Sequence, residues 1–230
     1  MKIIGHRGSK GEAPENTMLG IKKAIDLGCD GVEIDIHLTK DHVPIVIHDP
    51  TLNRTTNGSG AILEHTSEEI KKFDAGQNEK IPFLTDVLKY FSELKINNSP
   101  KELFIEIKCP NVEKITCDLI LKYNLLEEVT VKCFDHRISL ILKNILPQLK
   151  TGIILAGRPV HPPELVKAAH ADLYSVNVST VDPETVQECR KHGYKTFVWN
   201  INNEKDFKKF KQINPDYIST DFPTKIMKFN

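Results

Sequence analysis

Long apolar runs are missing from this sequence. No stretch of its 230 residues approaches the ~18 to 20 continuous apolar residues that a membrane-spanning helix needs. The amino terminus, MKIIGHRG, also lacks the apolar segment of a secretory signal peptide. We therefore expect no stable insertion into a membrane, and we expect a cytoplasmic protein.

An excess of charge of either sign is missing as well. Lysine and arginine together number 31, and aspartate and glutamate together also number 31. A balanced chain gives no reason to expect a polyanion such as nucleic acid as a partner. A small-molecule partner is the more natural expectation, and we make no prediction of the oligomeric state.

Cysteine is scarce, and its five residues are spread along the chain without any C-x-x-C pair. This spacing argues against a disulfide framework and against a zinc site built from cysteines. We interpret all five as reduced packing residues, which are typical of a reducing compartment.

An alternation of strands and helices is what the chain does contain. Short runs typical of buried strands recur at residues 2–5, 31–36, 103–108, 129–134, 151–156, 173–178, 196–201 and 216–220. Segments with helix signals lie between them, such as one with Pro183 near its start and Gly193 at its end. Eight alternations in 230 residues predict an α/β fold, a single (β/α)8 TIM-barrel domain over residues 1–230.

Residues 43–49, VPIVIHD, form a ninth candidate strand. Only residues 39–42 separate it from the strand before it, and a parallel crossover needs about a dozen residues. The segment must fold back as a hairpin, and counting from the turn predicts that His48 lies opposite Glu33. We interpret the turn-rich residues that follow, approximately 50–85, as a small insertion into the barrel.

Acidic side chains alternate with apolar ones in the predicted barrel strands. Glu33 and Asp35 share one face of GVEIDI, and Glu106 repeats the pattern in FIEIK. These acids would meet at the carboxyl-terminal mouth, where barrel enzymes place their sites. Three carboxylates suit Mg²⁺ or Ca²⁺ better than zinc. A solvated acidic face is the weaker alternative, because the strands otherwise read as covered on both faces.

Two histidines end neighbouring segments of the predicted site. His6 ends the first strand and His48 ends the hairpin, so we expect the two imidazoles to face each other across the metal. An imidazole with an ordinary pKa near ~6.5 exchanges protons readily near neutral pH. We predict a general acid and a general base, and we interpret the other histidines as packing residues.

Two cations belong to the same predicted pocket. The planar fork of Arg7 and the point charge of Lys108 both suit phosphate oxygens. An anionic phosphate ester is therefore the expected occupant. For Arg7, an ion pair with a nearby acid such as Glu15 is equally consistent with the sequence.

Seven short motifs occur in a fixed order along the chain: HRG (6–8), PENT (14–17), EIDIHLTKD (33–41), PIVIHDPTLNRTTNGSG (44–60), EIK (106–108), FVWNIN (197–202) and YISTDFP (217–223). Together they resemble the glycerophosphodiester phosphodiesterase family over the whole length. The resemblance implies metal-dependent hydrolysis of glycerophosphodiesters, such as glycerophosphocholine or glycerophosphoethanolamine, to glycerol 3-phosphate and an alcohol.

The resemblance also implies roles for individual residues. It implies His6 and His48 as the acid–base pair, Glu33, Asp35 and Glu106 as ligands of Mg²⁺ or Ca²⁺, and Arg7 and Lys108 as phosphate contacts. Trp199 would lie near the glycerol or the head group, although a core aromatic on the same strand face as Phe197 is equally consistent. The chain departs from the usual pattern at Cys133 and Asn200, which leaves the preferred head group open.

Other functions on the same fold stay open. A lysophospholipase D or a phospholipase-C-like phosphodiesterase would favour an apolar rim, and residues 61–63 are the only short apolar candidate in the predicted insertion. A non-catalytic phosphodiester-binding barrel would be expected to lack one of the histidines or acids. A Schiff-base aldolase would need Lys108 in apolar surroundings, and Glu106 two residues away argues against that.

Overall fold

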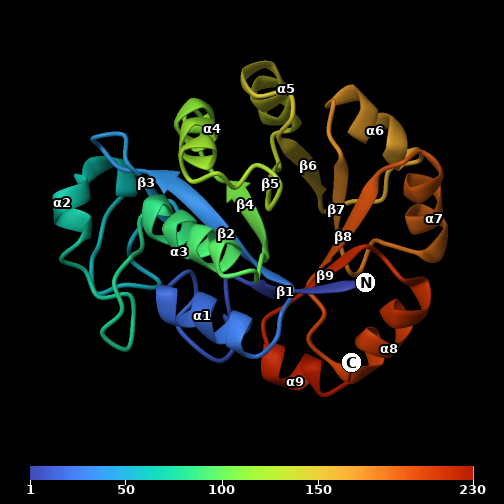
Figure 1. The fold of residues 1–230 in the computed structure, drawn as a ribbon, viewed down its shortest axis with the longest axis horizontal. Helices are drawn as coiled ribbons and strands as arrows, with labels where there is room; N and C mark the ends of the chain where they lie inside the picture. The colour runs from blue at the N-terminus through green and yellow to red at the C-terminus, as the bar shows by residue number, and fades with distance from the viewer. Residues whose placement is uncertain (230) are drawn as a thin grey trace.

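Eight parallel strands close into a barrel, and helices surround it (Figure 1). The computed structural model describes residues 1–229. The barrel strands follow the order β1-β9-β8-β7-β6-β5-β4-β2, and β1 also pairs with β2, which closes the ring. The (β/α)8 barrel is therefore confirmed. The strands are β1 Lys2–His6, β2 Gly31–Leu38, β3 Pro44–Val46, β4 Glu102–Ile107, β5 Val129–Cys133, β6 Lys150–Leu155, β7 Leu173–Asn177, β8 Lys195–Trp199 and β9 Tyr217–Thr220.

The helices alternate with the barrel strands. They are α1 Met18–Asp26, the 3-10 helix η1 Ile62–Glu64, α2 Ser67–Ile70, α3 Leu84–Ile96, α4 Glu113–Lys122, α5 His136–Ile145, α6 Pro162–Ala168, α7 Pro183–Lys191, α8 Glu204–Ile213 and α9 Pro223–Met227. The hydroxyl of Thr17 caps α1 by accepting from the backbone N–H of Gly20. Thr66 and Glu69 form a capping box on α2. Within residues 1–229, every helix is too short or too polar to serve as a membrane span.

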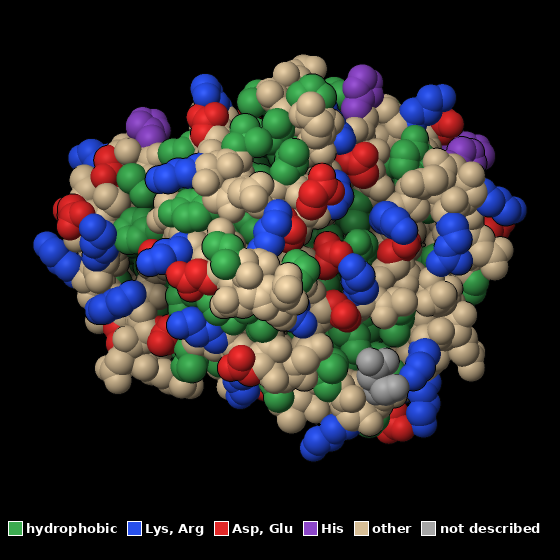
Figure 2. Space-filling model, in the orientation of Figure 1, with side chains coloured by type: hydrophobic (Ala, Val, Ile, Leu, Met, Phe, Trp, Pro, Cys, Tyr) green, Lys and Arg blue, Asp and Glu red, His purple; other side chains and the backbone are tan. Residues whose placement is uncertain are grey.

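The surface carries both signs of charge. Figure 2 shows acidic and basic side chains interspersed over the face turned to the viewer. This mixture follows from the equal numbers of basic and acidic residues, 31 of each. The observed face therefore offers no broad single-sign field that would attract a polyelectrolyte.

An aromatic layer fills part of the barrel interior. The ring of Phe104 lies 4.8 Å from that of Phe197 and 4.9 Å from that of Tyr217, centroid to centroid. Because side chains alternate along a strand, Phe104 and Glu106 share the inner face of β4, with Glu106 nearer the carboxyl end. The aromatic rings therefore form an apolar floor beneath the acidic side chains.

The hairpin after β2 differs from the predicted one. β3 pairs antiparallel with the end of β2 as expected, but it has only three residues. The observed register pairs Ile36 with Val46. The predicted pairing of His48 with Glu33 would have shifted the two strands by one residue relative to this register, so that prediction was wrong. The turn holds residues 39–43, one more than predicted, and a 3.1 Å backbone hydrogen bond joins its first and last residues. His48 lies beyond the end of β3.

The segment between β3 and α3 has a small apolar cluster of its own. It contains η1 and α2, and α2 lies to the left of the barrel in Figure 1. The buried side chains of this cluster are Ile45 of β3 and, from the segment itself, Ile47, Leu52, Ile62, Ile70, Ala75 and Ile81. Helix α3 begins at Leu84, just inside the interval predicted as an insertion. The segment packs beside the barrel without adding a strand to the ring.

The aromatic floor predicts a specific cost of truncation. Phe104 is fully buried, so Phe104→Ala removes a ring from a packed layer and should lower the free energy of unfolding by about 3 to 5 kcal/mol. Val160→Ala is the control, since Val160 is 85% exposed and should change that free energy by less than about 0.5 kcal/mol. Urea unfolding at neutral pH measures both. Equal effects of the two changes would contradict the assignment of Phe104 to the barrel floor.

Candidate active site

A pocket of about 210 Å³ lies at the carboxyl-terminal mouth of the barrel. It contains seven of the eight residues predicted for the site, and Asp35 is the exception. Its lining is His6, Arg7, Lys10, Glu33, His48, Glu106, Lys108, Lys132, Phe134, Ile154, Trp199, Asn200 and Ser219. The barrel therefore brings together residues that are up to 213 positions apart in the sequence (His6 to Ser219).

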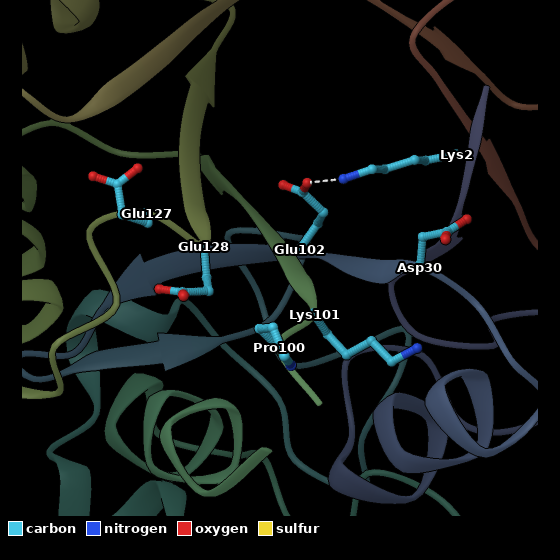
Figure 3. Close-up of a pocket in the computed structure, with 7 residues that line it drawn as sticks. All are labelled: Lys2, Asp30, Pro100, Lys101, Glu102, Glu127 and Glu128. Carbon is cyan, nitrogen blue, oxygen red and sulfur yellow. Dashed lines mark hydrogen bonds and ion pairs between the residues drawn. The ribbon is translucent and has the colours of Figure 1, made fainter. Parts of the chain in front are cut away.

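A second pocket lies at the opposite, amino-terminal end of the strands and has a volume of about 270 Å³ (Figure 3). Its lining is Lys2, Asp30, Pro100, Lys101, Glu102, Glu127 and Glu128. Lys2 pairs with Glu102, and the ammonium of Lys101 donates to a backbone carbonyl. Asp30 accepts from the backbone N–H of Ile3. These contacts join the strand ends at this mouth of the barrel.

Three carboxylates, which we call the carboxylate triad, belong to the carboxyl-terminal pocket: Glu33, Asp35 and Glu106. All three are buried, and one oxygen from each lies within 4.8 Å of the others. The β2–β4 register explains this, because it places Asp35 beside Glu106. Three oxygen donors in a buried cluster fit a hard divalent cation.

Two lysines reach the triad from neighbouring strands. The buried ammonium of Lys132 lies 3.0 Å from Glu33 Oε1 and 3.4 Å from Glu106 Oε2. Burial alone would raise the pKa of Glu33, but the charges of Lys132, His6 and Arg7 and the hydrogen bond from Lys132 together outweigh it and lower that pKa. Lys108 pairs with Glu106 and lies 3.2 Å from Asp35 Oδ1. The triad is therefore paired with cations on two sides.

Lys132 was not predicted as a site residue. The sequence feature that could have indicated it is a lysine inside the mainly apolar strand VTVKC, on the same face of β5 as Thr130. A lysine that is 3% exposed needs an anionic partner, and the neighbouring strand β4 supplies one in Glu106.

Arg7 forms the ion pair that was one of its two predicted arrangements, and it also lines the pocket. Its Nη1 donates to Glu15 Oε1 at 2.8 Å, so the ion pair is present. Its Nε also lies 3.3 Å from Asp35 Oδ2, and its side chain lines the pocket. Burial alone would lower the pKa of Arg7, but Asp35 and Glu15 outweigh it and raise that pKa. The guanidinium therefore stays charged beside the triad.

The PENT motif contributes a further contact to the triad. The side-chain amide of Asn16 donates to Asp35 Oδ2 at 2.9 Å, and its carbonyl accepts from the backbone N–H of Asp35 at 3.3 Å. Asn16 has a left-handed backbone with φ of 56°, a conformation that asparagine tolerates better than most residues. This role of Asn16 was not predicted from the sequence.

Each of the two predicted catalytic histidines contacts an aspartate through Nδ1. His6 Nδ1 lies 2.5 Å from Asp221 Oδ1, and His48 Nδ1 lies 2.7 Å from Asp49 Oδ1. A carboxylate only accepts hydrogen bonds, so Nδ1 donates in both pairs and Nε2 of the neutral ring is left to accept a proton. Both histidines line the pocket, and each is oriented by a carboxylate.

Asp221 is a second residue that was not assigned a role from the sequence. It lies directly after β9, the strand that pairs with β1, which ends at His6. Its other oxygen accepts from the side-chain amide of Asn202 at 2.7 Å. Burial alone would raise the pKa of Asp221, but the hydrogen bonds from His6 and Asn202 and the charges of His6 and Lys10 together outweigh it and lower that pKa.

Trp199 packs as a core aromatic and also lines the pocket. Its ring packs against the apolar floor that includes Phe104 and Phe197. Its indole N–H is buried and has no hydrogen-bond partner among residues 1–229, and its side chain lines the pocket. A buried donor of this kind can serve a ligand oxygen. Outside the pocket, His37 agrees with the packing interpretation, since its Nε2 donates to the carbonyl of His48 at 3.0 Å.

The Asp221–His6 pair predicts a pH-dependent contribution to stability. A carboxyl with a lowered folded pKa stabilises the fold above its unfolded pKa, near ~3.9 for aspartate, and that contribution is lost as the pH falls. Asp221→Asn should therefore lower the free energy of unfolding by about 1 to 3 kcal/mol at pH 7, and the difference from the unaltered chain should shrink below about pH 4.

Urea unfolding at pH 7, 5, 4 and 3 measures this difference. Asp118→Asn is the control, because the Asp118 side chain is 56% exposed and pairs only with Lys114 on the same helix. A destabilisation by Asp221→Asn that stays constant from pH 7 to pH 3 would contradict the assigned hydrogen bond to His6.

Comparisons with known proteins agree with this geometry. The sequence model of the glycerophosphoryl diester phosphodiesterase family matches residues 6–225. A glycerophosphodiester phosphodiesterase of Caldanaerobacter subterraneus subsp. tengcongensis is 36% identical over 235 residues, which cover 96% of this chain and 94% of that protein.

Two solved structures share the fold over nearly the whole chain. A phosphodiesterase of Oleispira antarctica, in complex with the product sn-glycerol-3-phosphate, has a TM-score of 0.87 and 28% identity, covering 100% of this chain and 96% of that one. A glycerophosphodiester phosphodiesterase of Agrobacterium tumefaciens has a TM-score of 0.86 and 26% identity, covering 99% of each chain.

Proposed function

The chain belongs to the glycerophosphoryl diester phosphodiesterase family, and from this premise we propose that it hydrolyses glycerophosphodiesters to glycerol 3-phosphate and an alcohol. Glycerophosphocholine and glycerophosphoethanolamine are the substrates we propose first. The observation that carries the proposal is one pocket lined by two histidines, two cations and two carboxylates: His6, His48, Arg7, Lys108, Glu33 and Glu106. An oxygen of the third carboxylate, Asp35, lies within 4.8 Å of oxygens of the other two. Release of glycerol 3-phosphate would connect the protein to lipid and glycerol metabolism.

A divalent cation, Mg²⁺ or Ca²⁺, is the cofactor we propose. The carboxylate triad would hold it, because its oxygens are clustered and buried. When bound, such an ion neutralises negative charge on phosphoryl oxygens. The triad contains no histidine or cysteine, which argues against zinc as the preferred ion.

We assign phosphate recognition to Arg7 and Lys108. Both line the pocket, and both lie beside Asp35 at the edge of the triad. A guanidinium presents a planar set of donors to phosphate oxygens, and an ammonium adds a compact charge. Lys132 is buried deeper and pairs with two triad members, so we assign it to holding the triad. The unpartnered indole N–H of Trp199 is a further donor for the substrate.

We assign proton transfer to His6 and His48. One Nε2 removes a proton from the nucleophile as its oxygen bonds to phosphorus, and the other imidazolium donates a proton to the alcohol oxygen as the P–O bond breaks. The nucleophile is either water or the neighbouring glycerol hydroxyl, and the latter route passes through a cyclic phosphate. The Nδ1 contacts with Asp221 and Asp49 keep both rings in the tautomer that this exchange needs.

Removal of one imidazole should abolish most of the turnover. His48→Ala should lower kcat for glycerophosphocholine by about 10²- to 10⁴-fold, the usual contribution of one general acid or base. Enzyme-coupled detection of glycerol 3-phosphate measures the rate. The control is His161→Ala, because His161 is exposed and lies outside the pocket lining. Turnover by His48→Ala at the unaltered rate, with the fold intact by circular dichroism, would contradict the assignment.

The triad can be tested without turnover. Glu106→Gln removes one anionic ligand and should weaken Mg²⁺ or Ca²⁺ binding at least ~10-fold in isothermal titration calorimetry. Glu68→Gln is the control, since the side chain of Glu68 is 75% exposed on α2 and should leave the affinity unchanged. Equal affinity of the unaltered chain and Glu106→Gln would place the cation elsewhere.

A lysophospholipase D is the second candidate. A cavity of about 470 Å³ adjoins the pocket through Glu106, Lys108 and Phe134, and Cys109, Pro110 and Ile138 also line it. This cavity has room for more than a small alcohol. Against this candidate, only Leu63 of the apolar residues 61–63 is exposed as a large hydrophobic side chain, while Ile62 is buried. Faster release of choline from lysophosphatidylcholine than from glycerophosphocholine would favour this second function.

A further inference from the structure

Arg54 lies in the segment after β3, outside the lining of the catalytic pocket, and it bonds to two carboxylates at once. Its Nε and Nη2 donate to the two oxygens of Asp49 at 2.8 and 2.9 Å. Its Nη1 and Nη2 donate to the two oxygens of Glu15 at 2.9 and 2.8 Å. One guanidinium therefore makes two bidentate contacts, the geometry in which an arginine fork is most specific.

Each of these carboxylates also contacts a residue of the pocket. Asp49 Oδ1 accepts from His48 Nδ1 at 2.7 Å, and Glu15 Oε1 accepts from Arg7 Nη1 at 2.8 Å. Arg54 is thus one residue removed from a proposed acid–base group and from a proposed phosphate contact. Nη2 of Arg54 bonds to the same two oxygens, Asp49 Oδ1 and Glu15 Oε1, that hold His48 and Arg7.

We propose that Arg54 is a positioning residue for the reaction: it holds Asp49 so that Asp49 fixes the orientation and tautomer of His48, and it holds Glu15 so that Glu15 fixes Arg7. This inference rests on the proposed function, because its kinetic consequence is measured in that reaction. It concerns a residue that does not touch the substrate.

A role in stability alone does not account for this arrangement. The side chain of Arg54 is 45% exposed, and exposed ion pairs contribute little to the free energy of unfolding. Asp49 and Glu15 share the guanidinium of Arg54. Without this cation their negative charges repel each other, and each carboxylate loses two hydrogen-bond donors. The hydrogen bonds from Arg54 lower the pKa of Asp49, which keeps it an acceptor for His48.

A double-mutant cycle on the kinetics tests the link to His48. Arg54→Met should lower kcat for glycerophosphocholine by about 10- to 100-fold, the usual effect of removing a residue that orients a ligand or catalytic group. Asp49→Asn should lower kcat at least as much, and the double variant should be no slower than Asp49→Asn by more than about threefold. Losses that multiply in the double variant would overturn the proposal.

Two further variants separate positioning from charge. Arg54→Lys keeps the charge without the fork, so it should recover less than a tenth of the lost kcat; full recovery would overturn the bidentate role. Arg158→Met is the matched control, because Arg158 pairs with Asp182 on the surface and its side chain is 66% exposed. It should leave kcat and KM unchanged.

A spectroscopic measurement tests the proposal independently of turnover. Nitrogen-15 NMR of histidine-labelled protein, with the His48 signals identified from His48→Ala, should show the Nδ1-protonated tautomer in the unaltered chain and a tautomer mixture in Arg54→Met. An unchanged tautomer in Arg54→Met would overturn the proposal. If the unaltered chain released no glycerol 3-phosphate, the proposed function would fail, while this NMR comparison would still decide the role of Arg54.

Discussion

Charge compensation inside the barrel is the constraint on which the site depends. The three members of the carboxylate triad are at most 6% exposed, and an unpaired carboxylate at such a position is costly. Lys132 reaches them from β5, Lys108 from the end of β4, and Arg7 from the loop after β1. These three places lie on or beside the neighbouring strands β1, β2, β4 and β5, so the triad is compensated only when these strands are paired.

The two histidine–aspartate pairs rest on different parts of the molecule. His6 and Asp221 follow β1 and β9, two paired strands of the barrel, and that pair is part of the ring itself. His48 and Asp49 lie after β3, and Arg54 from the same segment holds Asp49 in place. The segment between β3 and α3 therefore contains both a proposed acid–base group and the residues that hold it, in a stretch whose sequence pattern predicts only turns.

Local periodicity explains which parts were predictable. The alternation in GVEIDI and FIEIK shows which side chains share a strand face, so the eight strands and the triad followed from short stretches. The register of the β2–β3 hairpin could not be predicted from periodicity, because periodicity does not reveal the length of a turn. One extra residue in the turn shifts the alignment of the two strands. The partners of Lys132 and His6 lie 99 and 215 positions away, and such contacts depend on which strands become neighbours.

The central claim is that the carboxyl-terminal pocket binds a divalent cation and a glycerophosphate group together. A crystal structure of the protein with glycerol 3-phosphate and Mg²⁺ or Ca²⁺ tests it most directly. The account predicts a cation on oxygens of Glu33, Asp35 and Glu106, with the phosphate beside Arg7 and Lys108. Glycerol 3-phosphate bound at the amino-terminal pocket of Figure 3, or a cation held without the triad, would contradict it.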